Sequence, residues 1–353
     1  MLLGFVATAA LSAGADDQES PQLPPVVVTG TRTPVPATEV PADMTVLTRD
    51  EIERSPALTL DDLLRQLPDF STFRRSSSLV TPPAEDPEAQ GVTLRGIGPG
   101  GASRALVLLD GVPINDAFGG WIYWNEIPVD SIERIEIARG GMSSLWGNFA
   151  LGGVVNVITR PIEPGVGGRV SGGNRSTTQD AISYAHGIGP LKLEADGDLL
   201  HSGGWNIIAS HQRGPIDQDA GLDGRRVGGR LEYALGRDAL VFARAHYYDE
   251  ERGNGTPLRD ADASRASVIT GASASLLGGR TEATVFGHFS RLRQTFSETN
   301  EPRTAEMLTQ IQHVPSTDVG GALTWSRPLP ANNLVTVGSD VRLIAGKSRD
   351  EFF

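Results

Sequence analysis

The stretch IERIEIARGGMSSLWGNFALGGVVNVITR, residues 132–160, predicts two β-strands joined by a tight connection. Ile132, Ile135 and Ile137 alternate with charged side chains, which is typical of a strand with one buried face. The central SSLWGN is long enough for a tight turn or one helical turn, and ALGGVVNVITR predicts a second strand. These residues therefore close a compact unit near Arg160.

A β-hairpin is predicted upstream, in RALVLLDGVPIND, because Asp110-Gly111 is a dipeptide that a two-residue type I′ turn favours. GVTLR (91–95) predicts a strand antiparallel to residues 104–109. In this topology the turn 96–103 lies at one end of the unit, and residues 71–90 and 110–126 lie together at the other end.

LRGIGPGG (94–101) matches the G-x-G-x-x-G fingerprint of dinucleotide-binding folds. That fold requires a helix to begin at the glycines and a crossover of about a dozen residues before the next strand. Here the next strand begins four residues after Gly101, and Pro99 adds a rigid kink. We therefore assign the glycines to a turn between antiparallel strands and exclude a nucleotide site.

Two short helices are predicted nearer the N-terminus. Thr48 and Glu51 form a capping box for TRDEIERS, and Thr59 begins TLDDLLRQLP, whose leucines share one face. Residues 71–90 carry no periodic apolar pattern and predict a long exposed loop.

Residues 1–15, which are apolar and end in Ala13-Gly14-Ala15, have the pattern of a secretion signal, although no Lys or Arg stands ahead of Leu2. Residues 16–43 are rich in proline and predict a tether with a short apolar patch, VVV.

The C-terminal part alternates small or apolar residues with charged ones over segments of about ten residues, as in LKLEADGD and LVFARAHY. Residues 166–345 give about ten such strands. Because the apolar face is dominated by Ala, Val, Leu and Gly, lipid suits it better than a packed core, which favours a membrane barrel over a soluble β-sandwich or solenoid.

Composition excludes several classes of function. The net charge of −12 repels phosphate backbones, so nucleic acid is not an expected partner. With no cysteine, no i, i+4 histidine pair, no G-x-S-x-G and no Walker lysine, we expect no catalytic residue, no metal site and no cofactor, and so no enzyme. His246 and His288 are interpreted as wetted residues on the inside of the barrel.

The order of these elements resembles the N-terminal region and plug domain of TonB-dependent outer-membrane receptors. The order is VVVTGTR, the two short helices, VTLRGIG, LVLLDGVPIND and the stretch 132–160. The resemblance covers the whole chain and is sharp through Arg160. It implies an α+β plug domain followed by an antiparallel transmembrane β-barrel. The family's barrel has twenty-two strands, so about ten make an incomplete one, and we expect the chain to be a fragment. The implied divisions are a signal peptide (1–15), a periplasmic tether with the TonB box (16–43), the plug (44–160) and the N-terminal portion of the barrel (161–353).

The resemblance also implies partners. TonB, with its inner-membrane energising complex, would add a strand to the TonB box. Outer-membrane lipid would surround the barrel, and a metal chelate would be the substrate. The expected TonB-binding residues are Val26, Val27, Val28, Thr29 and Gly30.

Two further groups of residues follow from the resemblance. Arg95 and Arg139, each followed by glycine, resemble arginines that pair with carboxylates on the barrel's inner wall, and we expect them to latch the plug. Cations and aromatic faces suit an anionic, partly aromatic metal chelate at the extracellular mouth, although Trp121 and Trp124 alternatively only pack the plug against the wall. The substrate-facing set is Arg74, Arg75, Trp121, Tyr123 and Trp124.

The expected function is TonB-dependent active transport of a scarce solute, a ferric siderophore first, with cobalamin, haem or another metal chelate as alternatives. A surface signalling receptor with the same plug is a second possibility, although such a member is expected to carry an extra folded domain of roughly 80 residues ahead of the TonB box. A passive channel would need neither VVVTG nor a plug.

Overall fold

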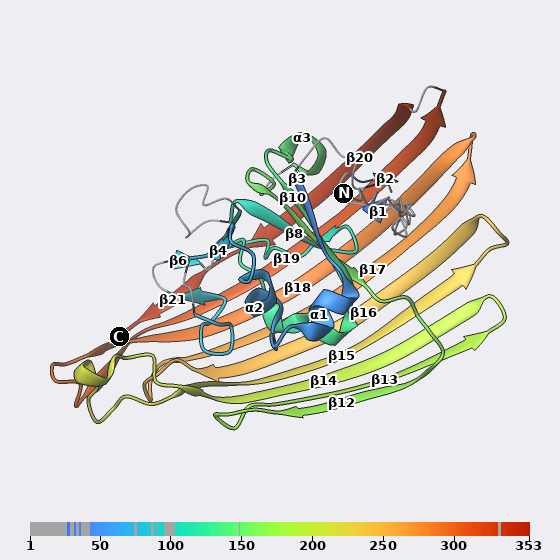
Figure 1. The fold of residues 1–353 in the computed structure, drawn as a ribbon. Coiled ribbons are helices and arrows are strands. Elements are labelled where there is room, and N and C mark those ends of the chain that lie inside the picture. The colour runs from blue at the N-terminus through green and yellow to red at the C-terminus, as the bar shows by residue number, and fades with distance from the viewer. Residues whose placement is uncertain are drawn as a thin grey trace, which may run out of the picture.

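The computed structural model of the 353-residue chain describes residues 27–28, 32, 35–36, 43–73, 76–85, 88–89, 91–94, 103–147, 149–330 and 333–353. An N-terminal domain of short helices and strands lies against one face of a large, curved antiparallel sheet formed by the C-terminal half (Figure 1). Among the described residues, no helix is long and apolar enough to cross a membrane.

The N-terminal domain is built around a five-stranded sheet. In spatial order its strands are β3 (Asp43–Leu47), β10 (Ile132–Arg139), β11 (Gly153–Thr159), β8 (Ala105–Leu109) and β9 (Val112–Pro113). β8 and β11 run parallel, and the other neighbours run antiparallel. The predicted hairpin is confirmed, since Asp110 and Gly111 have φ angles of 48° and 81°, both positive as a type I′ turn requires.

Three short helices accompany this sheet: α1 (Arg49–Arg54), α2 (Leu60–Leu64) and α3 (Ser143–Trp146). The predicted capping box is present, with the Thr48 backbone N–H donating to the Glu51 carboxylate at 2.8 Å. Leu60 and Leu64 are fully buried in one apolar core with Ile135. Three 3₁₀ turns complete the described helical segments: η2 (Trp124–Glu126), η3 (Val129–Ser131) and η4 (Ser210–Gln212).

The prediction of an exposed loop over residues 71–90 is wrong where the structure describes it, because Ser77–Val80 and Pro82–Ala84 are largely buried. The carboxylates of α2 accept hydrogen bonds from the serine hydroxyls of this segment. The Ser78 hydroxyl donates to Asp61 at 2.6 Å, and the Ser77 hydroxyl donates to Asp62 at 2.6 Å. The segment also contains parts of two two-stranded sheets: β4 (Phe70–Thr72) pairs with β7 (Val92–Leu94), and β5 (Ala84–Glu85) pairs with β6 (Glu88–Ala89). A third two-stranded sheet lies upstream, where β1 (Val27–Val28) pairs with β2 (Val35–Pro36).

The expected antiparallel pairing of residues 91–95 with 104–109 is also wrong, since β7 pairs with β4 and β8 pairs with β9 and β11. The expected placement of the turn 96–103 needs correction as well. The hydroxyl of Ser103, its last residue, donates to the Gly120 carbonyl at 2.6 Å, so this end of the turn lies beside residues assigned to the opposite end.

The C-terminal sheet has ten strands among the described residues, as the alternation predicts, and neighbours in sequence are neighbours in space. The strands are β12 (Gly165–Gly172), β13 (Thr178–Ile188), β14 (Leu191–Trp205), β15 (Ala220–Ala234), β16 (Ala239–Gly253), β17 (Asp260–Leu276), β18 (Gly279–Thr299), β19 (Glu306–Leu329), β20 (Asn333–Gly346) and β21 (Arg349–Phe352). β20 and β21 both pair with β19. Short turns close one end of the sheet, and longer connections such as 206–219 close the other.

The two faces of this sheet differ as the alternation predicts. On the inner face, which contacts the N-terminal domain, His246, Ser267 and His288 stand side by side in register on β16, β17 and β18. On the outer face the neighbouring row contains the exposed apolar side chains of Tyr247 and Phe289. In these central rows the polar side chains therefore face inward and the apolar ones outward.

Candidate functional site

A buried residue of the N-terminal domain, Glu126 at the end of η2, contacts the inner face of the sheet. Its side chain is 2% exposed. One carboxylate oxygen lies 2.6 Å from His246 Nε2 and 3.3 Å from the Ser267 hydroxyl, and the other lies 3.5 Å from a guanidinium nitrogen of Arg265. His288 extends the cluster through a 2.9 Å contact with Ser267.

The charged groups of this cluster are buried away from water, since the Arg265 side chain is 1% exposed. Burial alone raises the pKa of Glu126. The attraction of Arg265 and the hydrogen bond and charge of His246 outweigh burial and lower that pKa to about 2. The carboxylate is therefore ionised at neutral pH and pairs one domain with the other.

A second group of contacts holds the loop that follows β9. Arg265 donates to the Ile114 carbonyl at 2.8 Å, and Arg342 donates to the Asn115 carbonyl at 3.2 Å. The Ser316 hydroxyl donates to Asp116 at 2.9 Å. Side chains on the inner faces of β17, β19 and β20 thus form hydrogen bonds with the three consecutive residues 114–116.

A third group lies toward the long-loop end of the sheet. The Asn125 amide donates to Glu250 at 2.7 Å, and Arg252 donates to the Ser78 carbonyl at 3.0 Å. Glu250 and Arg252 also pair with each other and are nearly fully buried. Apolar packing from Trp121 and the β19 residue Val314 adjoins them.

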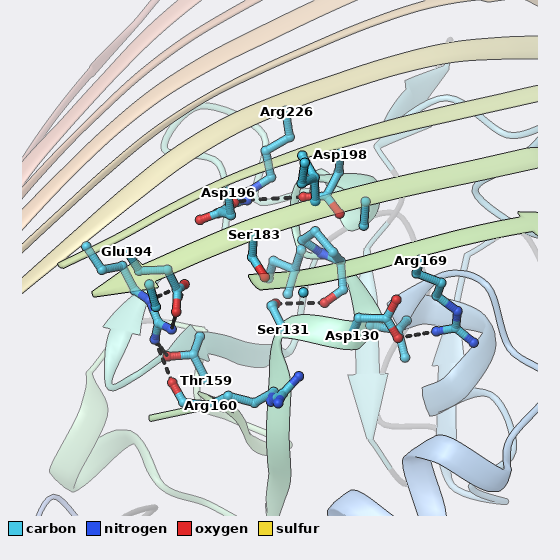
Figure 2. A pocket seen from close by; sticks show the side chains of 18 of the residues that line it. Asp130, Ser131, Thr159, Arg160, Arg169, Ser183, Glu194, Asp196, Asp198 and Arg226 are labelled. Carbon is cyan, nitrogen blue, oxygen red and sulfur yellow. Dashed lines mark hydrogen bonds and ion pairs between the residues drawn. The ribbon is translucent and has the colours of Figure 1, made fainter. Parts of the chain in front are cut away.

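A cavity of about 640 Å³ adjoins this cluster, with Glu126 and His246 in its lining, and separates α1, η3 and the end of β11 from β12–β16. Figure 2 shows its charged lining. Arg230 pairs with Glu194 at 2.7 Å and donates to the Arg160 carbonyl at 2.6 Å, and Asp130 pairs with Arg169. The Arg169 side chain is 53% exposed, so this ion pair is open to solvent, whereas Arg230 and Glu194 in the same lining are 14% and 15% exposed.

Residues 36–154 match the family model of the TonB-dependent Receptor Plug Domain. The chain carries a TonB-dependent receptor plug. This family resides in the outer membrane, and the chain is accordingly an outer-membrane protein with its plug against the inner face of barrel strands.

Solved structures share this arrangement at low sequence identity. The ferric enterobactin receptor of Pseudomonas aeruginosa is 17% identical with a TM-score of 0.64, over 90% of this chain and 50% of that one. The siderophore receptor PirA of Acinetobacter baumannii is 16% identical with a TM-score of 0.62, over 85% and 47%. The copper transporter OprC is 17% identical with a TM-score of 0.68, over 87% and 47%. The chain thus spans about half the length of these structures and has their fold.

The predicted latch residue Arg139 does not reach the barrel. It pairs with Asp69 and, at 3.5 Å, with Asp43, both within the plug, and it donates to the Thr45 hydroxyl at 2.6 Å. Its position at the end of β10 ties together segments of the plug itself. Three ion pairs that join plug and barrel have the opposite polarity, since Glu126, Asp130 and Asp110 of the plug pair with barrel arginines. Arg32 of the N-terminal segment pairs with Asp340 of β20 at 3.0 Å.

The three predicted aromatic substrate contacts are buried. Trp121 and Tyr123 pack in one apolar cluster with Tyr248 of the barrel, and Trp124 packs edge-on against Phe70 in the plug core with ring centroids 5.9 Å apart. The packing alternative therefore describes Trp121 and Trp124 better than an open mouth. The interpretation of His246 and His288 as wetted residues is wrong as well, since both are buried at the plug.

Several predicted residues lie outside the described parts of the chain: Val26, Thr29, Gly30, Arg74, Arg75 and Arg95. The backbone of Val27–Val28 is described as β1, and β2 occupies one of its edges. Sequence reasoning missed Glu126, Arg265 and Arg342. The only signal for the two arginines was their inward phase along their strands.

Proposed function

We propose that the chain takes part in TonB-dependent active transport of a scarce solute, with a ferric siderophore as the expected cargo, across the bacterial outer membrane. The observation that carries this proposal is a plug bound to the inner face of the sheet through the buried Glu126 cluster, beside a cavity that Glu126 also lines. A plug held in this way would block passage through the barrel until energy is supplied to move it. A passive channel needs neither the plug nor that energy.

The work would enter through the segment Val26–Gly30. A β-prone segment with one free edge can add to the sheet of a partner protein. We propose TonB as that partner, pulling from the periplasm with energy drawn from the inner membrane. A pull on this segment would act first on β3 of the plug, which follows it in sequence and pairs with β10.

The cargo proposal rests on proteins of the same fold. These include receptors for ferric enterobactin and ferripyoverdine and a copper transporter, so metal-bearing solutes recur among them. The aromatic residues expected to contact cargo are buried here, which leaves Arg74 and Arg75 as the proposed cargo contacts of the plug.

Growth rescue tests the proposal. A strain deficient in outer-membrane iron uptake would express the full-length gene and grow on a panel of iron chelates and cobalamin. We expect rescue by at least one ferric siderophore, and loss of that rescue when residues 26–30 are deleted. Outer-membrane amounts of both proteins, measured on blots, provide the control. Rescue that survives the deletion would contradict the energy-coupling step.

A further inference from the structure

Three long connections lie together at one end of the C-terminal sheet (Figure 1). They are residues 206–219 between β14 and β15, residues 254–259 between β16 and β17, and residues 300–305 between β18 and β19. Outer-membrane barrels have short turns on the periplasmic side and longer loops on the outside. The turns at the opposite end, such as 189–190 and 277–278, are shorter, so the three connections face the cell surface.

The first and third connections are joined by a forked ion pair. Arg303 Nε lies 2.8 Å from each carboxylate oxygen of Asp217, and Arg303 Nη2 donates to Asp217 Oδ1 at 2.5 Å. The Ile216 N–H donates to the Arg303 carbonyl at 3.4 Å, and the Gly214 N–H donates to Asp217 at 2.8 Å. The Asp217 side chain is 1% exposed, so water has little access to its carboxylate.

The backbone of both connections is adapted to this contact. A Cβ atom at position 214 would overlap the carbonyl oxygens of Pro302 and Arg303, so only glycine allows the two connections to come this close. Arg303 has a φ angle of 65°, in the left-handed region that few residues with a side chain adopt. One position in each connection thus has the conformation or the small size that the contact requires.

The middle connection is bound to both of its neighbours. The Gln218 N–H donates to the Gly255 carbonyl at 2.8 Å. The Leu258 N–H donates to Glu306 Oε2 at 3.0 Å, and the Thr256 hydroxyl donates to the other oxygen of the same carboxylate. Glu306 begins β19 directly after the third connection. Each connection therefore contacts the other two, or the strand residue that adjoins them.

The first connection also borders the plug. A cavity of about 350 Å³ has Asn206 and Arg213 of this connection and Leu58 and Leu79 of the plug in its lining. Trp205, immediately before the connection, packs on the apolar cluster that contains Leu79. The position of the connection therefore sets how far this cavity is open on that side.

We propose that Asp217 and Arg303 form a clasp that joins the three connections into one rigid unit and holds residues 206–219 as a strap beside the plug. With the clasp closed, the strap keeps its place and the three connections move together. With the clasp open, the strap moves by itself and the plug surface at Leu79 becomes accessible from the outside. The proposal depends neither on the identity of the cargo nor on TonB.

Hydrogen–deuterium exchange of the purified full-length protein, measured by mass spectrometry, tests the clasp. In the variant Asp217→Asn, amides of both 206–219 and 300–305 should exchange about tenfold faster, because loss of a charge-assisted fork lowers the free energy of local opening. Exchange within β15 and β18 should change less than about twofold, since such strands open mainly with the whole fold. Asp219→Asn is the matched control, because Asp219 lies in the same connection and is exposed, and it should leave exchange unchanged.

Gly214→Ala is an independent variant that changes no charge. Its Cβ forces the two connections apart, so it should accelerate exchange in both of them by a similar factor, about tenfold. Gly253→Ala is its control, because an added Cβ there has no atom of the described residues within 4 Å. Acceleration confined to 206–219 would mean that Asp217 orders only its own connection, and this result would overturn the proposal.

Access to the plug provides a second measurement. The chain contains no cysteine, so Leu79→Cys introduces a single thiol beside the strap. A water-soluble maleimide should label this thiol about fivefold faster when Asp217→Asn is added. Equal labelling rates with and without the second change would overturn the assignment of 206–219 as a strap. If Asp217→Asn fails to assemble, Arg303→Lys, which keeps the charge and removes the fork, must show the faster exchange and labelling.

Discussion

The two sides of the plug–barrel interface are built from the same kinds of residue and differ in their access to water. On the dry side, Glu126 and Arg265 have side chains that are 2% and 1% exposed. On the wet side, Asp130 and Arg169 pair at the rim of a large cavity with the arginine half exposed. A dry pair is costly to break one partner at a time, whereas a wet pair exchanges its contacts with water at little cost. The comparison indicates that the dry side holds the plug and that the wet side yields first.

The largest effect is expected from Glu126→Ala. This change leaves Arg265 as an uncompensated buried charge, which typically costs about 3–5 kcal/mol. Urea unfolding of the purified protein, followed by tryptophan fluorescence, measures the loss. Glu126→Gln keeps the shape and one acceptor and should cost less, which makes it the control. A loss below about 1 kcal/mol in the alanine variant would contradict the proposed importance of the dry cluster.

A covalent bond across the dry side should abolish transport. The chain contains no cysteine, and Ser316 Oγ lies 2.9 Å from an Asp116 carboxylate oxygen, so Asp116→Cys with Ser316→Cys places two thiols close together. We expect growth on the rescuing iron chelate to stop when the disulfide forms and to resume with reductant. Each single cysteine variant serves as a control. Full growth with the disulfide shown to be intact would mean that this part of the plug stays in place during transport.

Acid should remove the stabilising contribution of Glu126 within a defined range of pH. Because the pKa of Glu126 falls to about 2 on folding from an ordinary value near 4.5, its stabilising contribution is complete above about pH 4.5 and disappears as the pH falls toward 2. Between pH 7 and 5 the contribution of this residue to stability should therefore stay constant. Subtraction of the Glu126→Gln curve from that of wild type isolates its contribution, and a difference that vanishes already at pH 5 would contradict the assignment.

The smallest effect is expected on the wet side. Asp130→Asn removes a hydrated ion pair with Arg169, and such pairs contribute about 0–1 kcal/mol. The same urea assay should detect almost no change. A loss comparable to that of Glu126→Ala would remove the distinction between the two sides.

Local features of the fold could be predicted from the sequence because their causes are local. Thr48 and Glu51 lie three residues apart and cap the same helix, and Asp110-Gly111 carries the backbone freedom that its turn requires. The period of two in the barrel strands assigns each side chain to a face without knowledge of the partner. His246 and His288 were assigned inward for this reason.

The site could not be predicted because its contacts join residues far apart in sequence. Glu126 and His246 are 120 positions apart, and no local pattern indicates how the plug sits on β16–β18. Arg139 shows the opposite error, in which a contact predicted from the sequence is not formed. Its charge and its following glycine suggested a contact with the barrel, yet its position at the end of β10 places Asp69 of the plug within reach first. Trp121 and Tyr123 had the right chemistry for cargo and equally for packing, and only their burial decides between the two.

The most direct measurement of the dry–wet distinction is a pair of double-mutant cycles in the same protein. One cycle combines Glu126→Gln with Arg265→Gln, and the other combines Asp130→Asn with Arg169→Gln, each followed by urea unfolding. We predict a coupling free energy of about 1.5 kcal/mol or more for the first pair and of about 0.5 kcal/mol or less for the second. Equal coupling in the two cycles would contradict the view that the plug is held on one side and free to yield on the other.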